Sequence, residues 1–485
     1  MTLDAILKNI PILKNAEDID IEISDICYDS RNIKPNCIFV CLKGAKFDGH
    51  DYINEAFSKG TSVVVVQEDV DFKNIPIIKV ENTRKFLALA SANFFGNPDK
   101  KLKTIAITGT KGKTTTSFMV RSILEKASLK TGIIGTIGVV MDENITKLNN
   151  TTPESYEIHK NFKKMVDNGA NCVVMEVSSI GVKSYRSYGI DFDYAVFTNF
   201  SSDHIGENEH KDLDEYFKFK NMLFNNCKNA VVNLDDEKSE KIISEHLCDK
   251  KTFSLKSNSD LKAENINLIN NGGEIGVTFD FSGFINSNNI KIKIPGVFNV
   301  YNAMAASLVC KLIGVSDENI KLGLSETKVK GRVEPINISY DYALFIDYAH
   351  NAVSMENILT TFKEYNPKRL ITMFGAGGNR PKIRRYEMGE TSGKFSDLSV
   401  ITSDNPRNEN PLDIIEDIKL GINKTNGKYI VIPDRKEAIE YCIKNAEKGD
   451  IIVLAGKGHE DYQEINGVKY PFDERMVIND IVNRK

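Results

Sequence analysis

Short apolar runs alternate with amphipathic stretches along the whole chain, beginning in its first hundred residues. Cys37–Leu42 and Ser62–Val66 are short and almost wholly apolar, which predicts buried strands. Tyr52–Lys59 has the spacing of a helix and is followed by a glycine, a common helix end. Residues 1–98 are therefore expected to form a small N-terminal α/β domain.

The same alternation continues on a larger scale over residues 99–332. Helical stretches separate the apolar runs, which is the βαβ rhythm of a mostly parallel sheet. The segment 255–293 is rich in Asn and Ser and alternates apolar with polar residues, so it predicts an antiparallel insertion. The strand-like runs are Thr104–Thr108, Ile133–Ile134, Cys172–Met175, Ala195–Phe197 and Ala230–Val232.

The rhythm restarts over residues 333–485, where five further runs predict a doubly wound, Rossmann-like domain. A chain of 485 residues is too long for one core and suits about three domains. The predicted fold class is α/β, with a central domain built on the parallel sheet of phosphate-loop ATPases. The five runs are Ala343–Ile346, Arg369–Phe374, Leu398–Thr402, Tyr429–Val431 and Ile451–Leu454.

Composition narrows the choice of partners. Hydrophobic residues make up 41% and charged residues 27% of the chain, as in soluble globular proteins. The net charge of −4 shows no basic excess, so nucleic acid is not expected as a partner. We see no signal-peptide pattern and no apolar run near the ~20 residues of a spanning helix. Eight cysteines without a CxxC pair are typical of reduced thiols, and we expect a cytoplasmic monomer that does not bind membranes.

A glycine loop follows the run Thr104–Thr108 and precedes a helix-like stretch. Such a loop turns its backbone N–H groups toward a phosphate, while Lys113 can reach the β/γ oxygens and Thr114 can ligate Mg²⁺. Two residues separate its glycines, where the common loop has four, and this short form indicates one kind of ligase. We expect ATP to bind here; the alternative is a glycine turn before an ordinary helix. The loop comprises Gly109, Thr110, Lys111, Gly112, Lys113, Thr114 and Thr115.

Other polar residues of the central region also stand at strand ends. Glu176 follows a buried strand and is the expected second ligand of Mg²⁺, unless it is only a surface residue. His204 also follows a strand, where an Asp-His pair could instead cap a helix. Lys220 alone predicts a surface lysine. Asn299, with Asn302, could contact adenine or phosphate, or could cap the Ala-rich helix that follows.

The third region places a polar, glycine-rich segment after each of four strands. Because the carboxyl ends of parallel strands meet at one edge of a sheet, these segments predict one site. Arg380 and Arg407 could bind carboxylates, and Asp404 and Glu460 an ammonium, which suits an amino-acid ligand. Surface salt bridges are the alternative. The segments are Asp347–His350, Gly375–Arg380, Ser403–Arg407 and Ala455–Glu460.

Over nearly its whole length the chain resembles the Mur ligase family, and within it the UDP-N-acetylmuramyl-tripeptide synthetases of the diaminopimelate-adding type. The N-terminal motifs are Asp29–Arg31 and Lys43–His50. The central motifs are Gly109–Thr115, Asn150–Pro153, Glu176–Ser179, Thr198–His204 and Gly296–Asn302. The C-terminal motifs are Gly331–Glu334, Asp347–His350, Gly375–Arg380, Asp404–Arg407, Asp434–Arg435 and Gly456–Gln463.

This resemblance implies roles for individual residues. ATP would be held by the glycine loop with Asn299 and Arg332, and the catalytic set would be Lys113, Glu176, His204 and Lys220. Mg²⁺ would be held by Thr114, Glu176 and Lys220, whose amine is carbamylated in the family. The UDP-muramyl dipeptide would contact Ser30, Thr151, Thr152, Ser178, Ser184 and Arg186. The incoming amino acid would contact Arg380, Asp404, Asn405, Pro406, Arg407, Gly456 and Glu460.

The pattern Asp-Asn-Pro-Arg at 404–407 marks the use of meso-diaminopimelate in the family. Lysine-adding relatives lack its arginine, since only a diamino-dicarboxylate has a distal carboxylate for Arg407. The chain departs from the family pattern in three places. Ile180 stands where His is common, Asn379 replaces the usual Asp, and Pro381–Arg385 differs from a Lys-rich stretch. The last two leave room for a close analogue such as meso-lanthionine.

The resemblance therefore implies an ATP-dependent, ADP-forming ligase of peptidoglycan precursor synthesis, and so of cell-wall growth and division. It would add meso-diaminopimelate to UDP-N-acetylmuramoyl-L-alanyl-D-glutamate through an acyl phosphate. One alternative is the same ligase using meso-lanthionine or L-lysine. A folylpolyglutamate-type ligase is disfavoured by the N-terminal motifs of the chain. A nucleotide-switched binding protein is disfavoured because it has no need of four converging polar strand ends.

Overall fold

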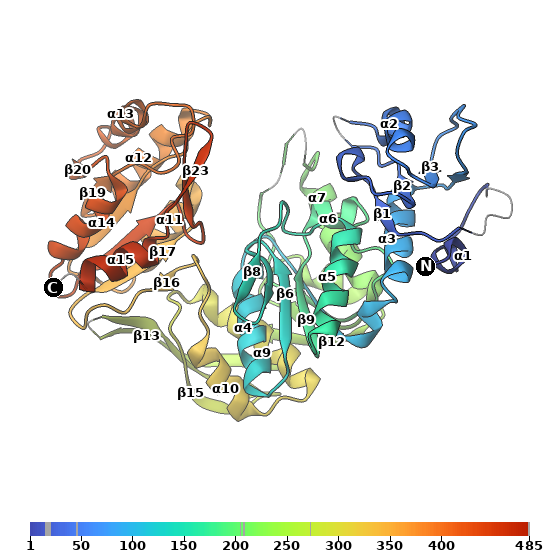
Figure 1. Cartoon of the computed structure of the whole chain (residues 1–485). Coiled ribbons are helices and arrows are strands. Elements are labelled where there is room, and N and C mark those ends of the chain that lie inside the picture. Colours follow the sequence, from blue (N-terminus) through green and yellow to red (C-terminus); the bar gives the residue numbers. More distant parts are fainter. Residues whose placement is uncertain (15–20, 45–46, 204, 207–208, 272, 484–485) are drawn as a thin grey trace. The chain divides into compact units, whose positions relative to one another are not determined.

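The computed structural model describes residues 1–14, 21–44, 47–203, 205–206, 209–271 and 273–483 (Figure 1). The chain divides into two compact units. The first unit contains residues 1–260 and 305–315, and the second contains residues 261–304 and 316–485. No helix within these described ranges combines the length and apolar character needed to cross a bilayer.

The N-terminal part of the first unit is a parallel sheet covered on both faces. Its strands lie in the order β1 (Asp25–Cys27), β2 (Cys37–Val40), β3 (Val63–Val66) and β4 (Ile77–Lys79). Successive side chains of a strand point to opposite faces. Val63 and Val65 accordingly pack with α1 (Leu3–Leu7) and α3 (Thr83–Phe94), and Val64 and Val66 pack on the face of α2 (Ile53–Ser58). The two predicted strands and the predicted helix are confirmed.

A larger sheet forms the rest of the first unit, in the order β12-β11-β10-β5-β9-β6-β7-β8. All neighbouring pairs are parallel except those made by β7 and β8, so the predicted mostly parallel sheet is confirmed. The central strand β5 therefore has β9 on one side and β10 on the other. The strands are β5 (Lys103–Thr108), β6 (Thr131–Gly135), β7 (Gly138–Met141), β8 (Asn144–Thr146), β9 (Cys172–Glu176), β10 (Phe192–Phe197), β11 (Cys227–Asn233) and β12 (Asp249–Ser254).

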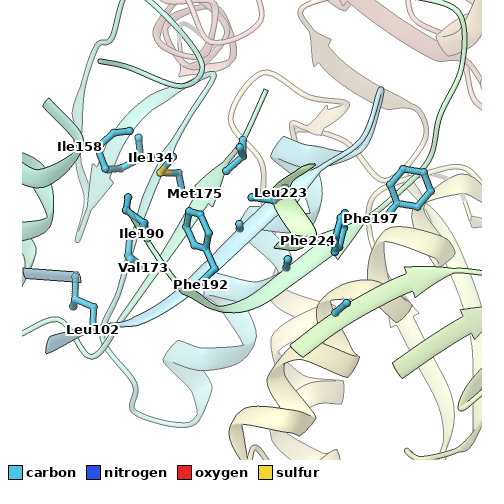
Figure 2. Close-up of a cluster of buried hydrophobic side chains, with 14 of the residues drawn as sticks. Leu102, Ile134, Ile158, Val173, Met175, Ile190, Phe192, Phe197, Leu223 and Phe224 are labelled. Atoms are coloured by element: carbon cyan, nitrogen blue, oxygen red, sulfur yellow. The ribbon is translucent and has the colours of Figure 1, made fainter. Parts of the chain in front are cut away.

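One face of this sheet is buried by a continuous apolar cluster. Figure 2 shows it, with Val173, Met175 and Phe192 projecting from the strands. Ile158 belongs to α5 (Ser155–Asp167), and Leu223 and Phe224 belong to the turn η4 (Met222–Asn226) that follows α7 (Leu213–Asn221). Alternate residues of β9 and β10 thus fix these helices on the sheet, because burial of the apolar side chains removes their surface from water.

The second unit contains the antiparallel insertion and the predicted Rossmann-like domain. Strands β13 (Leu261–Asn271), β14 (Glu274–Gly283) and β15 (Ser287–Ile292) pair antiparallel, which confirms the insertion. The other sheet has the order β16-β17-β21-β18-β19-β20, and its five predicted strands are parallel. They are β17 (Ala343–Asp347), β18 (Leu370–Phe374), β19 (Leu398–Ile401), β20 (Tyr429–Val431) and β21 (Ile451–Ala455), with β16 (Glu334–Pro335) antiparallel at the edge.

Helices cover both faces of this parallel sheet, as a doubly wound fold requires. One face packs against α11 (Ala352–Lys363), α12 (Ile383–Phe395) and α13 (Pro411–Ile422). The opposite face packs against α14 (Arg435–Lys444) and α15 (Glu474–Asn483). A hairpin of β22 (Tyr462–Ile465) and β23 (Val468–Pro471) follows β21.

The buried cluster of Figure 2 gives a test of stability. Phe192 is fully buried, so Phe192→Ala removes apolar contacts and leaves a cavity, and we expect it to lower the free energy of unfolding by about 3–5 kcal/mol. Leu247 of the same unit is fully exposed, and Leu247→Ala is expected to change the free energy of unfolding by less than about 0.5 kcal/mol. Urea unfolding of both variants measures the difference, and equal midpoints would contradict the cluster.

Candidate active site

The glycine loop lies between β5 and α4 (Lys113–Lys126), as the sequence predicts. Gly109 has φ +147° and Gly112 has φ +84°, conformations that favour glycine. A Cβ at position 109 would also lie 1.9 Å from the Thr198 hydroxyl oxygen. Glycine is therefore required at 109 both by the backbone and by the closeness of the next strand end.

The end of β10 holds the loop in place. Thr198 donates from its hydroxyl to the Lys111 carbonyl at 2.8 Å, and Asn199 accepts from the Lys111 N–H at 2.9 Å. Thr110 donates its N–H to the Asn199 carbonyl at 2.9 Å. These bonds fix the loop before any ligand binds, so the loop pays little further ordering entropy on binding.

Lys113 and the end of β9 complete the pattern of a nucleotide site. The Lys113 Nζ donates to the Gly109 and Thr110 carbonyls at 2.8 and 3.1 Å, which keeps the ammonium beside the loop. Thr114 donates from its hydroxyl to Glu176 Oε2 at 3.1 Å. Glu176 also accepts from the Thr136 hydroxyl and N–H, both at 3.0 Å. Thr136 is absent from our predicted site, although its place directly after the strand β6 was a usable signal.

The oxygens of Thr114 and Glu176 fit a magnesium ion. Mg²⁺ prefers hard oxygen ligands and commonly binds one or two carboxylates together with substrate phosphates and waters. Within the part of the chain that the structure describes, no cluster of three or more His, Cys, Asp or Glu side chains could hold a metal. A single carboxylate beside a hydroxyl is thus the arrangement this loop offers.

Lys220 is buried against the same loop, and the surface lysine that its local pattern predicts is wrong. Its side chain is 1% exposed, and its Nζ donates to the Gly109 carbonyl at 2.8 Å and lies 4.5 Å from the Tyr216 ring centroid. Burial, and then the charge of Lys113, lowers the pKa of Lys220 well below its usual value. The helix α7 is amphipathic, and Lys220 falls on its buried face.

Several residues predicted to bind the muramyl dipeptide gather beside Glu176. The Thr151 and Thr136 hydroxyls are 3.1 Å apart, and Thr152 donates to the Glu176 carbonyl at 3.0 Å. Ser178 donates its N–H to the Thr152 hydroxyl at 2.9 Å, and Arg186 donates to the Thr152 carbonyl at 2.8 Å. These side chains form one hydrogen-bonded wall that extends from the glycine loop.

Two other residues of this set, Ser184 and Ser30, have no recorded hydrogen bond to that wall among the described residues. Ser184 directly follows α6 (Ser179–Lys183), and Ser30 donates to Glu55 Oε2 at 3.3 Å. A polar pocket of about 620 Å³ lies in the same unit. Its lining includes Tyr28, Asp29, Asn150 and Glu154, neighbours in sequence of Ser30, Thr151 and Thr152.

The remaining central residues have other surroundings. His204 lies outside the residues that the structure describes, as do Ala45 and Lys46 of the N-terminal motif Lys43–His50. Asn299 is buried in the first turn of α9 (Phe298–Ile313), where its amide donates to the Pro295 carbonyl at 2.7 Å rather than capping a helix N–H. The guanidinium of Arg332 lies 5.2 Å from the Tyr348 ring centroid. Asn299 and Arg332 both belong to the second unit.

The four polar strand ends of the second unit meet in one pocket of about 320 Å³. The strands β17, β21, β18 and β19 are neighbours in the sheet, so their carboxyl ends lie at one edge. The predicted convergence is confirmed, although Pro406 is not among the lining residues. The lining includes Tyr348, His350, Gly375, Arg380, Arg385, Asp404, Asn405, Arg407, Gly456 and Glu460.

Hydrogen bonds fix the charged groups of this pocket. Arg407 donates to the Gly378 carbonyl at 2.6 Å and to Glu464 Oε2 at 3.2 Å, which sets the plane of its guanidinium. Asn405 donates to Glu460 Oε2 at 2.9 Å. Cationic and anionic groups thus line a single cavity, as an amino-acid ligand requires.

Known proteins resemble this chain along nearly its whole length. Family models match residues 22–95 (Mur ligase family, catalytic domain), 107–310 (Mur ligase middle domain) and 331–458 (Mur ligase, glutamate ligase domain). A Clostridium tetani protein named UDP-N-acetylmuramoyl-L-alanyl-D-glutamate–2,6-diaminopimelate ligase is 44% identical, over 99% of each chain. A Caldanaerobacter subterraneus protein of the same name is 42% identical, over 96% of this chain and 95% of its own.

Solved structures are also similar to this chain. A structure carrying that same ligase name is 27% identical with a TM-score of 0.73, and the match covers 100% of this chain and 99% of the other. A folylpolyglutamate synthase of Mycobacterium tuberculosis is 16% identical with a TM-score of 0.60, over 77% of this chain and 92% of its own. The second likeness shows a shared fold alone.

The buried Lys220 gives a prediction about stability and pH. Its pKa in the folded protein lies below the 10.5 of the unfolded chain, so the unfolded state binds more protons and stability rises with pH in this window. In CO₂-free buffer at pH 7, Lys220→Met should therefore raise the unfolding temperature by about 2–8 °C, a gain that shrinks toward pH 10. The exposed Lys218 lies on the same helix, and Lys218→Met should leave the unfolding temperature unchanged. A destabilised Lys220→Met protein would contradict the burial argument.

Proposed function

We propose that this chain, which belongs to the Mur ligase family, is an ATP-dependent ligase that adds meso-diaminopimelate to UDP-N-acetylmuramoyl-L-alanyl-D-glutamate. The pocket of the second unit carries the proposal. Arg380 and Arg407 line the same cavity as Asp404 and Glu460. A diamino-dicarboxylic acid presents carboxylates to the arginines and an ammonium to the acids. The name carried by relatives along nearly the whole chain supports the same substrates.

The first step would take place at the glycine loop, where ATP would be bound. The terminal carboxylate of the muramyl dipeptide attacks the γ-phosphorus of ATP, giving an acyl phosphate and ADP. Lys113 would offset charge on the β and γ oxygens, and the loop N–H groups would hold the phosphates. The muramyl dipeptide would be held by Thr151, Thr152, Ser178, Ser184 and Arg186, with Ser30 at its UDP end.

Thr114, Glu176 and carbamylated Lys220 would hold Mg²⁺, which when bound offsets the charge that develops on the transferred phosphoryl group. The low pKa of Lys220 favours the neutral amine, which is the form that reacts with CO₂ to give a carbamate. Carbamylation would convert a buried neutral amine into an oxygen ligand beside the glycine loop.

The pocket of the second unit would deliver the nucleophile. Arg380 and Arg407 would bind carboxylates of the diamino acid, while Asp404, Asn405 and Glu460 would orient its ammonium groups. The reacting amine must lose a proton before its lone pair attacks the acyl carbon, and phosphate is then expelled. Holding both reactants in place converts an encounter in solution into a local reaction.

We further propose three domains, residues 1–98, 99–332 and 333–485, for the UDP substrate, ATP and the amino acid. Asn299 and Arg332 would contact ATP. Such a ligase supplies peptidoglycan precursors and would work in the cytoplasm as a monomer.

The direct test is ADP formation by the purified protein with ATP, Mg²⁺ and UDP-N-acetylmuramoyl-L-alanyl-D-glutamate. meso-Diaminopimelate, meso-lanthionine, L-lysine and no amine are compared in parallel. We expect turnover with a diamino-dicarboxylate and at least about tenfold less kcat/KM with L-lysine, because Arg407 has no distal carboxylate to bind in lysine. No turnover with any amine would overturn the ligase and favour a folylpolyglutamate-type activity, for which folate and glutamate would be tried.

Arg407 gives a sharper prediction. Arg407→Met removes a charge-assisted pair with the distal carboxylate, so the KM for meso-diaminopimelate should rise about 10- to 100-fold while the KM for ATP stays unchanged. Arg384 lines the same pocket from an exposed position on α12, and Arg384→Met should change the KM less than about threefold. Equal effects of the two substitutions would mean that only the total positive charge matters.

A further inference from the structure

Lys457 is a fully buried cation directly behind the pocket of the second unit. Its side chain is 0% exposed, although it stands between two glycines just after β21. The Nζ donates to Asn405 Oδ1 at 3.0 Å and to the Tyr462 carbonyl at 2.7 Å, and lies 3.4 Å from Glu460 Oε2 and 3.7 Å from Asp404 Oδ1. One ammonium thus joins the ends of β19 and β21 and the start of β22.

These contacts reach the side chains that line the pocket. Asn405 accepts from Lys457 and from the Glu464 N–H at 2.9 Å, and donates to Glu460. Its amide is therefore locked in one orientation, with its oxygen toward Lys457. Lys457 itself is not among the residues that line the cavity. Its effect on a ligand would pass through Asp404, Asn405 and Glu460.

The charge balance also depends on Lys457. Two carboxylates, Asp404 and Glu460, face this one ammonium, so one negative charge remains at the wall of the pocket. Other ionisable groups nearby include Arg380 and Arg407 of the same cavity, of which Arg407 pairs with Glu464 at 3.2 Å. Glu474 of α15 pairs with Arg435 of α14 at 2.8 Å, and the ring centroid of Tyr462 lies 5.8 Å from the Nζ. The acidic wall of the pocket therefore keeps one negative charge to receive the ammonium of an amino acid, while Arg380 and Arg407 of the same cavity can receive its carboxylates.

We propose that Lys457 is a positioning residue for the amino-acid pocket, which orients Asn405 and Glu460 and sets the charge that receives the ammonium of the substrate. This inference rests on the proposed ligase function. Residues behind those that touch a ligand commonly change affinity or activity 10- to 100-fold when altered. The effect should therefore fall on one substrate of the three.

The test is steady-state kinetics of the full-length protein with Lys457→Met and Lys457→Arg. Lys457→Met should raise the KM for meso-diaminopimelate about 10- to 100-fold, with the KM values for ATP and the UDP substrate within twofold. Lys457→Arg keeps the positive charge, so its KM for the diamino acid should rise less than that of Lys457→Met.

Lys469→Met is the matched control. Lys469 is exposed on β23 and its Nζ lies 4.4 Å from the ring centroid of the same Tyr462, so we expect wild-type kinetics. An equal loss with all three substrates, or an equal rise of the KM for the diamino acid in both Lys457 variants, would overturn the positioning role and leave Lys457 as a folding residue. If the wild type turns over no diamino acid, the ligase proposal fails first.

Discussion

The parallel pairing of a few strands determines where the polar groups at their carboxyl ends lie. In the first unit β5 pairs with β9 so that Ile107 is level with Glu176, and with β10 so that Thr108 is level with Phe197. The loop after β5 therefore begins beside a carboxylate on one side and the Thr198 hydroxyl on the other. Because side chains alternate along a strand, a slip of one residue would turn Glu176 to the other face. The apolar cluster of β9 and β10 prevents that slip, so core packing and site geometry are one constraint.

Two buried lysines show how surroundings set the chemistry of the same side chain. The Lys457 Nζ is enclosed by Asp404, Glu460 and the Tyr462 carbonyl, and it holds these groups together at the wall of the pocket. Lys220 has an aromatic ring, a carbonyl and the charge of Lys113 around it, and among the residues that the structure describes only the more weakly acting Asp203 favours its protonation. Burial without a close carboxylate lowers its pKa, and a neutral amine is a nucleophile. The two buried lysines thus differ in the charged groups that surround them.

Apolar patterning predicts the strands because most of them are short, buried runs of the kind that a covered parallel sheet accommodates, although β20 is partly exposed. The convergence of strand ends follows from the same argument, and Gly375–Arg380 and Ser403–Arg407 do line one pocket. Burial of polar residues is harder to predict, since it depends on partners distant in sequence. Lys457 between glycines gives no periodic signal, and its partner Asn405 is 52 residues away. Lys220 is similar, because its carbonyl partner is 111 residues away.

The departures from the family pattern near the pocket also have a physical explanation. Asn379 has φ +55°, a left-handed conformation that Asn adopts readily, and its backbone N–H donates to Glu409. Glu409 in turn binds the buried Arg385 at 2.7 and 2.8 Å. The hydrogen bond to Glu409 involves the backbone of residue 379 and not its side chain. Asn in place of Asp therefore leaves the backbone that carries Arg380 in the same place.

The stretch Pro381–Arg385 likewise ends on a structural anchor, since Arg385 also binds Asp417 at 2.9 Å. Neither departure alters the charges that meet a diamino-dicarboxylate. meso-Lanthionine carries the same carboxylates and amines as meso-diaminopimelate and differs by a sulfur in place of a methylene. A difference of that size in an apolar contact is worth only about 1–3 kcal/mol. Discrimination between the two must therefore come from close packing against the apolar part of the lining, to which Ala376 and Met388 belong, and not from the arginines and acids of the pocket.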